Sequence, residues 1–451
     1  MGKLVQLVSH PTELLAVVQF FGFKTSMFPL DLSHAPGTLV TCYKYLDITS
    51  RSFSAVIKEL HPELRDAIMI FYLVLRALDT VEDDMLIDPK IKVPLLRTFH
   101  DKLNTKDWTF HGNAETERDR VVLTGFDNIL AEFHKLKPAY QDIVKRITQK
   151  MGNGMADYIL DENFNTNGVN TVADYDLYCH YVAGLVGEGL TDLMVLAKFA
   201  DADVLADDYR LLNSMGLFLQ KVNIIRDYFE DLEDGRLFYP REIWLKYTDS
   251  LPNFHKNAEE RLSGVACIND LVLNALGHAV DVLTYLSLIR EATSFNFCAI
   301  PQVMAIATLA EIYNNPDVLH KNVKIRKGTT CKLILGCRTL PGVVQIFRHY
   351  LQVINKKSDV KDPNYLKIGI KLGEIQQFCD VMYPPEGSTP AGAKRSLKKI
   401  NENIEKRGNF DVDGEQYVQQ ETLKCRATVL VVVTVLAAAM FHLVQLTLNR
   451  A

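Results

Sequence analysis

Two acidic motifs of the same form stand far apart in this sequence, Asp79-Thr80-Val81-Glu82-Asp83 and Asp227-Tyr228-Phe229-Glu230-Asp231. Each has carboxylates at i, i+3 and i+4, so on a helix all three would share one face. Like charges this close repel each other, which predicts a cation between them. Ligand sets made only of oxygen favour a hard ion such as Mg²⁺, which often shares its coordination shell with substrate phosphates. The predicted metal ligands are Asp79, Glu82, Asp83, Asp227, Glu230 and Asp231.

A single acidic motif could equally be an exposed helix cap with an internal ion pair. Arg76 lies one turn before Asp79, where it could pair with that carboxylate or contact a phosphate. The first motif ends an apolar run, and acids at the C-terminal end of a helix are disfavoured by the helix dipole. The second motif also follows an apolar run and a basic residue, Arg226. The repetition favours a diphosphate held through Mg²⁺ between two helices.

Polar residues near these motifs could complete such a site. Gln220 and Asn223 stand two turns and one turn before the second motif, so their amides could support the carboxylates or a metal-bound water. The segment Ser50-Arg51-Ser52-Phe53 offers hydroxyls, a guanidinium and backbone N–H groups at a predicted helix start, which is a candidate anion site. Lys324 and Arg326 would point the same way in an extended chain and could bind phosphate. A solvated charge run is the alternative for this last pair.

Between the motifs lies Tyr178-Cys179-His180-Tyr181-Val182-Ala183-Gly184-Leu185-Val186-Gly187. Gly184 and Gly187 are poor helix formers, so they predict a helix break or the close approach of a ligand. Tyr178 and Tyr181 could line an apolar cavity, although both could also be core residues. His180 is interpreted as a packed histidine.

Helices must position these residues, because apolar residues recur with helical periodicity and alternating strand patterns are nearly absent. The predicted helices cover residues 52–78, 139–160, 171–200, 207–232, 260–292 and 298–313. The last of these contains Pro301 and Gln302 and is expected to be a buried pocket wall and no membrane span. The segment Gly235–Pro240 contains a cation and aromatic residues and is predicted to form a flap.

The composition supports a large apolar core, since 48% of the 451 residues are hydrophobic. The net charge of −5 argues against nucleic acid as a partner. The eight cysteines show no metal-binding spacing and predict free thiols in a reducing compartment. The apolar run from Leu14 to Phe23 lacks the features of a signal peptide.

The C-terminal residues 427–448 carry no formal charge and follow Lys424 and Arg426. About 22 residues at 1.5 Å each give roughly 33 Å, enough to cross a bilayer. We expect a tail anchor with the rest of the chain in the cytosol, and a buried core helix is the alternative. Residues 1–385 are predicted to form the catalytic domain and 386–426 a polar linker with room for one exposed helix near 393–407.

These motifs, in this order, resemble the eukaryotic squalene synthase (farnesyl-diphosphate farnesyltransferase) family. The resemblance is carried by the first acidic motif with Arg76, by 178–187, by Asn223–Tyr228, by Ser294–Gln302 and by Val323–Gly328, and it spans residues 38–345. It implies an all-α class I isoprenoid-synthase helical bundle around a central apolar cavity, plus the C-terminal transmembrane helix. It also implies residence in the endoplasmic reticulum membrane and a monomeric catalytic domain.

The family resemblance implies a two-step reaction. Two farnesyl diphosphates condense head to head into presqualene diphosphate, which rearranges and is reduced by NADPH to squalene, in the first committed step of sterol biosynthesis. The same resemblance assigns catalysis to Tyr178, Tyr181, Phe295 and Arg226. It assigns substrate contacts to Ser50, Ser52, Phe53, Tyr72, Val182, Gln220 and Asn223, and NADPH contacts to Arg51, Arg76, Lys324 and Arg326.

Several points stay open at the level of sequence. Tyr178 is the residue expected to take the proton of the first step, with Tyr181 as the alternative. Aromatic faces such as Phe53, Tyr72, Phe295 and Phe297 could stabilise carbocations. Glu188 interrupts an apolar stretch, and its partner is not predicted. A phytoene or dehydrosqualene synthase-like enzyme without the reductive step, and a tail-anchored helical scaffold without activity, are the rival functions.

Overall fold

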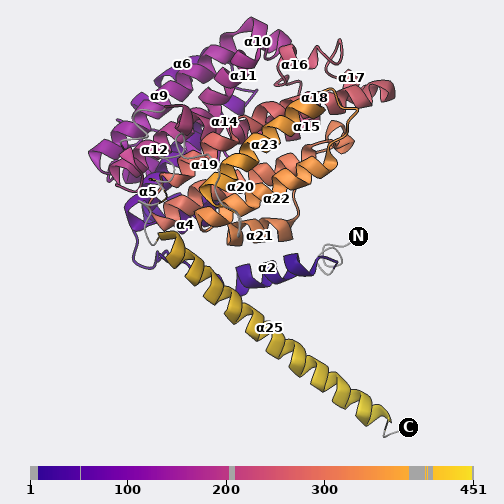
Figure 1. The fold of residues 1–451 in the computed structure, drawn as a ribbon. Coiled ribbons are helices and arrows are strands. Elements are labelled where there is room, and N and C mark those ends of the chain that lie inside the picture. The colour runs from indigo at the N-terminus through magenta and orange to yellow at the C-terminus, as the bar shows by residue number, and fades with distance from the viewer. Residues whose placement is uncertain are drawn as a thin grey trace.

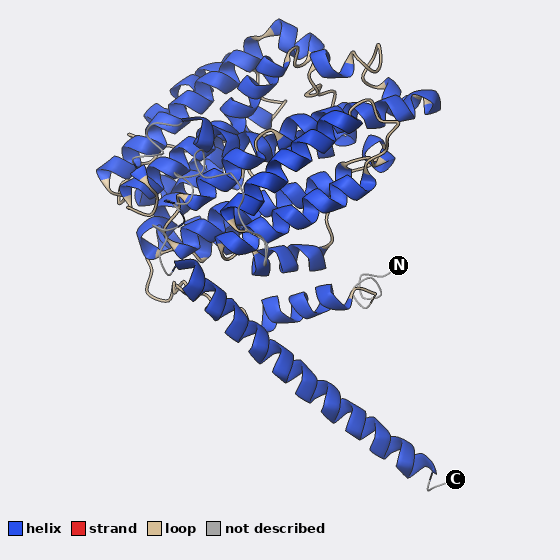
Figure 2. Cartoon of the chain, viewed as in Figure 1, coloured by secondary structure: helices blue, strands red, loops and turns tan. Residues whose placement is uncertain are grey.

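The computed structural model of the chain describes residues 9–50, 52–202, 209–384, 402, 404 and 410–448. Over these residues it consists of helices and loops, with no strand and one isolated β-bridge between Ala200 and Ile289 (Figure 2). The predicted all-α class is therefore confirmed. The helices up to α23 form a packed body, and the last helix, α25, extends from it as a single rod (Figure 1).

The helices in chain order are α2 (Pro11–Gly22), α3 (Gly37–Ser50), α4 (Ser52–Lys58), α5 (Pro62–Asp83), α6 (Pro89–Lys102), α7 (Val121–Thr124), α8 (Phe126–Phe133), α9 (Pro138–Leu160), α10 (Glu162–Asn167), α11 (Val172–Cys179), η1 (His180–Gly184), α12 (Leu185–Leu196), α14 (Tyr209–Arg226), α15 (Tyr228–Glu233), α16 (Arg241–Trp244), α17 (Asn253–Lys256), η2 (Ala258–Glu260), α18 (Arg261–Leu276), α19 (Ala279–Ser287), α20 (Ala292–Ile312), η3 (Pro316–Leu319), α21 (Lys327–Gly336), α22 (Leu340–Lys357), α23 (Tyr365–Met382) and α25 (Phe410–Leu448).

Local backbone chemistry divides some of the predicted helices. The helix expected over 52–78 is two helices, α4 and α5, because His61 precedes Pro62 and a residue before proline is driven out of the helical region. His61 has φ −52° and ψ 137° and accepts a hydrogen bond from the N–H of Glu63, so it caps α5. The helix expected over 207–232 likewise ends at Arg226, and α15 begins at Tyr228.

Helix α14 lies in the middle of the bundle and packs on η1, α12, α18, α19 and α20. Its approach to η1 depends on glycine, because a Cβ on Gly216 would stand 2.3 Å from the carbonyl oxygen of Ala183. On α12, a Cβ on Gly187 would stand 2.7 Å from the carbonyl oxygen of Leu212. The break predicted from Gly184 and Gly187 is present as the π-helical turn η1. These glycines permit close helix packing next to the cavity described below.

Two described helical stretches are long and apolar enough to cross a membrane, Ala258–Ser287 and Ala292–Ile312. Their apolar windows are 61% and 78% buried inside the body, so both serve as core helices. The prediction that residues 298–312 form a buried wall is confirmed. All eight cysteines are buried and free, which confirms the prediction of unpaired thiols.

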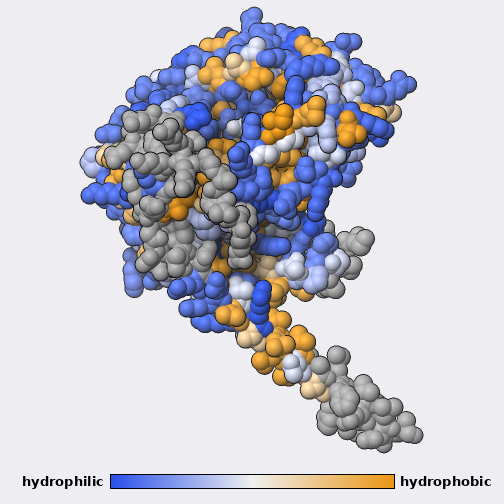
Figure 3. All heavy atoms as spheres, in the orientation of Figure 1, coloured by the Kyte–Doolittle hydropathy of each residue, from blue (hydrophilic) through white to orange (hydrophobic). Residues whose placement is uncertain are grey.

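The C-terminal helix differs from expectation at its start. Helix α25 begins at Phe410, so residues 410–426, which we predicted as polar linker, are helical. The rest of the predicted linker lies almost entirely outside the described residues. Cys425 and Glu421 are buried against the body, whereas Leu430, Val431 and Val435 are 60–67% exposed (Figure 3). Packing on the body therefore supports the first turns of α25, and its apolar continuation projects away.

Candidate active site

The first acidic cluster, Asp79, Glu82 and Asp83, stands at the C-terminal end of α5. Asp79 lies 3.6 Å from Arg76 (Oδ2 to Nη1), and its side chain is 31% exposed toward an apolar cavity. Burial raises the pKa of Asp79 to about 7, Arg76 opposes this shift, and the charge of Asp83 adds to it. The carboxylate therefore lies in the lining of the cavity, partly shielded from solvent and paired with one cation.

Glu82 shares this environment. Burial, followed by the charges of Asp83 and Asp79, raises the pKa of Glu82 above its usual range. The buried Lys92 donates from Nζ to the backbone oxygen of Glu82 at 2.7 Å. Asp84, the next acid in the sequence, instead accepts from Asn113 and from the N–H of Ala114, so it anchors a loop. Lys92 was not among the predicted residues, because no spacing connects it to the motif.

The second cluster is built differently, because the helix breaks within the motif. Asp227 accepts two hydrogen bonds from Arg226, at 2.8 Å from Nε and 2.6 Å from Nη2. Asn322 donates to Asp227 and, at 2.9 Å, to Glu230. Asn322 is a second residue that the sequence did not reveal, since it lies in a loop far along the chain. The carboxylates of the second cluster are therefore contacted by a cation, Arg226, and by an amide, Asn322.

The predicted flap 235–240 closes over the second cluster. Arg236 lies 3.1 Å from Asp231 (Nη2 to Oδ1). Burial raises the pKa of Asp231 to about 6, Arg236 lowers it, and Asp227 raises it further. Phe238 stacks on Tyr178 with ring centroids 5.0 Å apart. The flap therefore connects an acidic cluster with one of the two candidate tyrosines.

Tyr178 links the two clusters in space. Its pKa is raised well above the usual value first by burial, then by the charges of Glu82, Asp83 and Asp231 among others. A phenol can sense all three carboxylates only if both clusters lie within electrostatic reach of it. The ring is packed between Phe238 and Phe164, which stacks at 5.6 Å. Charges from both acidic motifs therefore act on the Tyr178 phenol, and their joint binding of a metal ion stays a prediction.

Below the clusters lies an apolar cavity of about 350 Å³. Asp79 and Arg76 lie at one part of its lining, and Arg76 donates to the Tyr72 hydroxyl at 3.3 Å. Seven of the predicted site residues line it, namely Phe53, Tyr72, Arg76, Asp79, Val182, Gln220 and Asn223. Helix α20 contributes Phe297, Cys298, Pro301 and Gln302. The chamber combines polar groups at its acidic end with aliphatic and aromatic walls elsewhere.

Other predicted residues lie outside this lining. Phe295 is fully buried in the core, because residues 295 and 297 point to different sides of α20 and only Phe297 reaches the cavity. Tyr181 lines a neighbouring depression with Tyr158 and packs over Gly154. Ser50 is buried at the end of α3, and its hydroxyl has no hydrogen-bond partner among the residues that the structure describes. Arg51 and the side chain of Ser52 lie outside the described part of the chain.

The predicted phosphate-binding pair is split. Lys324 is exposed, whereas Arg326 binds Glu13 of α2 through Nε at 3.0 Å and Nη2 at 2.5 Å.

Glu188, whose partner was not predicted, accepts from Lys150 at 2.6 Å and from Tyr209 at 3.3 Å. His180 contacts Asn213 at 2.9 Å, in agreement with a packed histidine.

The donor set of the acidic clusters fits Mg²⁺ shared with a diphosphate. Among the described residues, no three acidic, histidine or cysteine side chains are close enough to enclose an ion by themselves. Mg²⁺ that keeps water and substrate phosphate in its shell needs only one or two carboxylates. The raised pKa values of Asp79 and Asp231 indicate carboxylates that a divalent ion would stabilise.

The squalene/phytoene synthase family model matches residues 46–329. Squalene synthase ERG9 of Candida albicans is 62% identical over 432 residues, covering 94% of this chain and 96% of that protein. Squalene synthase ERG9 of Saccharomyces cerevisiae is 54% identical over 452 residues and covers 100% of both chains. A solved complex of TcSQS with the ligand E5700 is 42% identical, with a TM-score of 0.72, over 76% of this chain and 98% of that one. The chain therefore belongs to the squalene/phytoene synthase family, as an enzyme of the squalene synthase type.

Proposed function

We propose that this enzyme condenses two molecules of farnesyl diphosphate head to head into presqualene diphosphate and reduces that product to squalene with NADPH. The observation that carries the proposal is the chamber of apolar walls that has Asp79 of the first acidic cluster and Arg76 in its lining. A diphosphate would bind among the carboxylates, and a hydrocarbon tail would enter the cavity. Such an arrangement suits an isoprenoid diphosphate better than a fully polar or fully apolar substrate.

The six predicted metal ligands would bind the diphosphate group of the substrate through Mg²⁺. Bound Mg²⁺ would stabilise the negative charge that develops on the departing diphosphate. Asp79, Glu82 and Asp83 would hold it from α5, and Asp227, Glu230 and Asp231 from the α14–α15 junction. Arg226 and Asn322 keep Asp227 in place, and Arg236 keeps Asp231 in place.

The hydrocarbon end excludes water from the reacting carbons. Carbocations would be quenched by water, so an apolar chamber favours rearrangement over hydrolysis. The rings of Phe53, Tyr72 and Phe297 line the chamber and could stabilise passing positive charge. Tyr178 is our candidate for accepting the proton lost in the first step: its hydroxyl oxygen would take that proton while its own phenolic proton passes to a neighbouring carboxylate.

The reductive step would require NADPH to deliver hydride to the carbocation. The candidate phosphate contacts are Arg51, Arg76, Lys324 and Arg326. Lys324 is available at the surface, whereas Arg326 would have to exchange Glu13 for the cofactor phosphate. No glycine-rich dinucleotide motif precedes a helix in this sequence, so the cofactor would bind on the helical bundle itself.

The C-terminal part of α25 is our candidate for the membrane anchor. Residues 427–448 would span the bilayer, and the catalytic body, residues 1–385, would face the cytosol at the endoplasmic reticulum. Removal of residues from 386 onward is expected to yield a soluble monomeric enzyme that keeps its activity. A folded truncation without activity would contradict a purely anchoring role for this part.

The decisive experiment identifies the product by mass. The detergent-solubilised full chain would be incubated with farnesyl diphosphate and Mg²⁺, with and without NADPH. We expect squalene with NADPH and presqualene diphosphate without it. An equal yield of squalene without NADPH would refute the cofactor assignment, whereas dehydrosqualene in both would favour the non-reducing rival. No product in any condition, from a folded protein, would favour a scaffold.

A further inference from the structure

Helix α2 is apolar on nearly every side although it lies at the surface of the body. Its inner face packs Ala16, Val17 and Phe20 against Cys331 and Leu335 of α21. Its outer face exposes Leu14, Val18 and Phe21 at 39%, 37% and 78%. These three residues are spaced i, i+4 and i+7 and form one stripe, which we call the outer stripe. A helix that is apolar all round needs a second apolar surface against it.

No charged side chain of α2 is free to solvate the outer stripe. Glu13 is the sole charged residue of the helix, and it is buried. Its carboxylate is bound by Arg326 and by the Thr329 hydroxyl at 3.1 Å. The acid therefore fixes α2 to the body and leaves the opposite side without charge.

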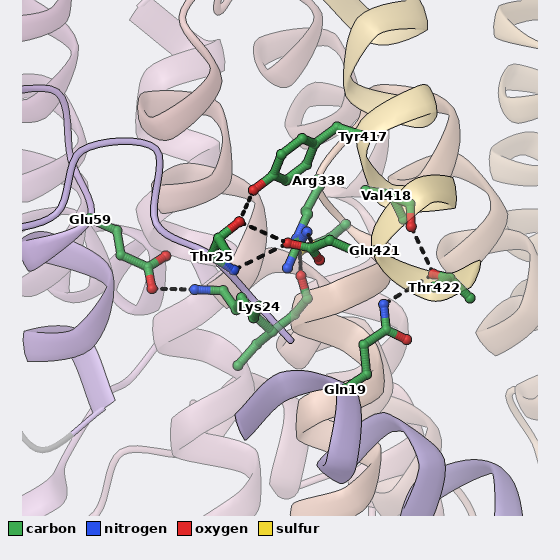
Figure 4. Close-up of polar contacts among 11 residues, drawn as sticks. Gln19, Lys24, Thr25, Glu59, Arg338, Tyr417, Val418, Glu421 and Thr422 are labelled. Atoms are coloured by element: carbon green, nitrogen blue, oxygen red, sulfur yellow. Dashed lines mark hydrogen bonds and ion pairs between the residues drawn. The ribbon is translucent and has the colours of Figure 1, made fainter. Parts of the chain in front are cut away.

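Helix α2 is also fixed to the first turns of α25 (Figure 4). Gln19 donates to the Thr422 hydroxyl at 3.0 Å. Glu421 accepts from the N–H of Thr25 at 3.2 Å and pairs with Arg338 at 2.6 Å. The Arg338 and Glu421 side chains are only 9% and 8% exposed, so this ion pair is shielded from water. The rod and α2 are thus held together at the base of the body.

The position of these contacts along α25 places α2 close to the start of the proposed span. The apolar, uncharged part of α25 begins at Ala427, five residues after Thr422, so Thr422 lies roughly 7 Å outside that part along the helix axis. Exposed Lys424 and Arg426 lie between these positions, where they would meet phosphate headgroups. Helix α2 would therefore lie at the headgroup level, from which the apolar faces of in-plane helices reach about 5–10 Å into the headgroup–acyl boundary.

We propose that α2 is a second membrane contact of this protein, an in-plane helix whose outer stripe of Leu14, Val18 and Phe21 enters the headgroup–acyl boundary of the bilayer. The inference rests on the proposed anchoring by α25, and it adds that the body is held at a defined orientation on the lipid surface. A single span would leave the tilt of the body on the membrane undefined. A second contact through α2, which Gln19 joins to Thr422 of α25, would limit that tilt.

The test uses an environment-sensitive dye on the full chain reconstituted in phosphatidylcholine vesicles. Because the native cysteines are all buried, a maleimide dye would label an introduced surface cysteine selectively. Gly22→Cys reports on α2, since a side chain there meets open space and the outer stripe stays intact. Val435→Cys reports on the proposed span. Leu262→Cys, 83% exposed at the start of α18 and remote from α2, is the matched control (Figure 1).

We expect lipids that carry a quencher in the upper acyl chain to quench the dye at positions 22 and 435 and not at 262. Adding Val18→Ser and Phe21→Ser should reduce quenching at 22 by about half or more and leave 435 unchanged. Quenching at 435 alone would overturn this inference and leave the anchor intact. Quenching at neither position would refute both. The emission of the dye at position 22 could instead shift to the blue as the amount of protein per vesicle rises, without quenching by the lipid. That result would assign the outer stripe to a contact with a second copy of the chain and would also overturn the inference.

Discussion

The two acidic clusters share the same residue types and spacing, yet the chain compensates their charge to different extents. The first ends the 22-residue helix α5, where the dipole disfavours acids, and its nearest cation is Arg76 at 3.6 Å. In the second cluster the helix is broken, and Arg226, Arg236 and Asn322 contact the three carboxylates. The pKa is raised to about 7 for Asp79 and to about 6 for Asp231.

This difference indicates that direct contacts with Arg226, Arg236 and Asn322 compensate the second cluster more fully than Arg76 and Lys92 compensate the first. The first cluster therefore gains more from an external cation. A buried carboxylate without a partner is unfavourable, whereas a paired one costs less. We therefore expect divalent ions to stabilise the fold mainly through the first cluster. The second cluster would contribute to catalysis by orienting the substrate diphosphate rather than by strong metal binding in the free enzyme.

Replacing one carboxylate in each cluster should give the largest effect and separate catalysis from stability. Asp79→Asn and Asp227→Asn should each lower squalene formation by about 10³-fold or more, because each removes charge that stabilises the leaving group. Without metal, Asp79→Asn should raise the melting temperature, since it removes a poorly solvated charge. Asp227→Asn should lower it, since Arg226 loses its partner. Thermal unfolding in EDTA at pH 8 measures the melting temperatures of the two variants. If both melting temperatures rise, or both fall, relative to the unaltered protein, the comparison of the two clusters is contradicted.

The two tyrosines provide the next largest contrast. Tyr178→Phe should lower presqualene diphosphate formation by roughly 10²- to 10⁴-fold, the range expected for loss of a general acid or base. Tyr181→Phe should lower it less than about 10-fold, because of the two rings it is Tyr178 that stacks on Phe238, in the segment whose Arg236 contacts Asp231. The assay omits NADPH so that only the first step is followed. A larger loss for Tyr181→Phe would transfer the proton-accepting role to that residue.

The sequence predicted that the carboxylates of the first motif share one helix, and Asp79, Glu82 and Asp83 all lie in α5. It also located α9 closely, with 139–160 expected and Pro138–Leu160 observed, since proline and apolar periodicity mark both the start and the face of that helix. The cavity wall at 298–302 was predicted for the same reason. These features depend on local patterns that a single sequence contains.

Features that depend on tertiary contact could not be predicted. At the helix break, Asp227 accepts from Asn322, which is distant in the sequence, and nothing in the residues around 227 resembles a helix stop. Lys92 and Asn322 stand outside any repeated spacing and reach the clusters only after folding. The same holds for residues 410–426, whose polar composition is typical of a linker although one face, with Glu421 and Cys425, is buried on the body.

A pH series in the absence of metal should sharpen the comparison further. The folded-state pKa of Asp79 is raised to about 7, above its usual value of about 4, so the native state binds more protons than the unfolded state between these values. Stability should then fall as the pH rises through that window, by on the order of several degrees in melting temperature. Asp79→Asn should flatten the slope and added Mg²⁺ should restore stability above pH 7. A slope unchanged in Asp79→Asn would exclude this residue as the cause.

The smallest expected effect comes from making the second cluster resemble the first. Arg236 is 48% exposed, so Arg236→Gln should cost about 1 kcal/mol or less of stability. Asp231 would then lose its nearest cation, and the stabilisation by Mg²⁺ should become larger than in the unaltered protein. Arg236 also lies over the ring of Phe238 at 5.8 Å, so its loss should loosen the flap on Tyr178 and modestly raise KM. Arg236→Lys keeps the charge and is the control that should preserve the normal Mg²⁺ response. If Arg236→Gln responds to Mg²⁺ as the unaltered protein does, internal compensation is not what distinguishes the two clusters.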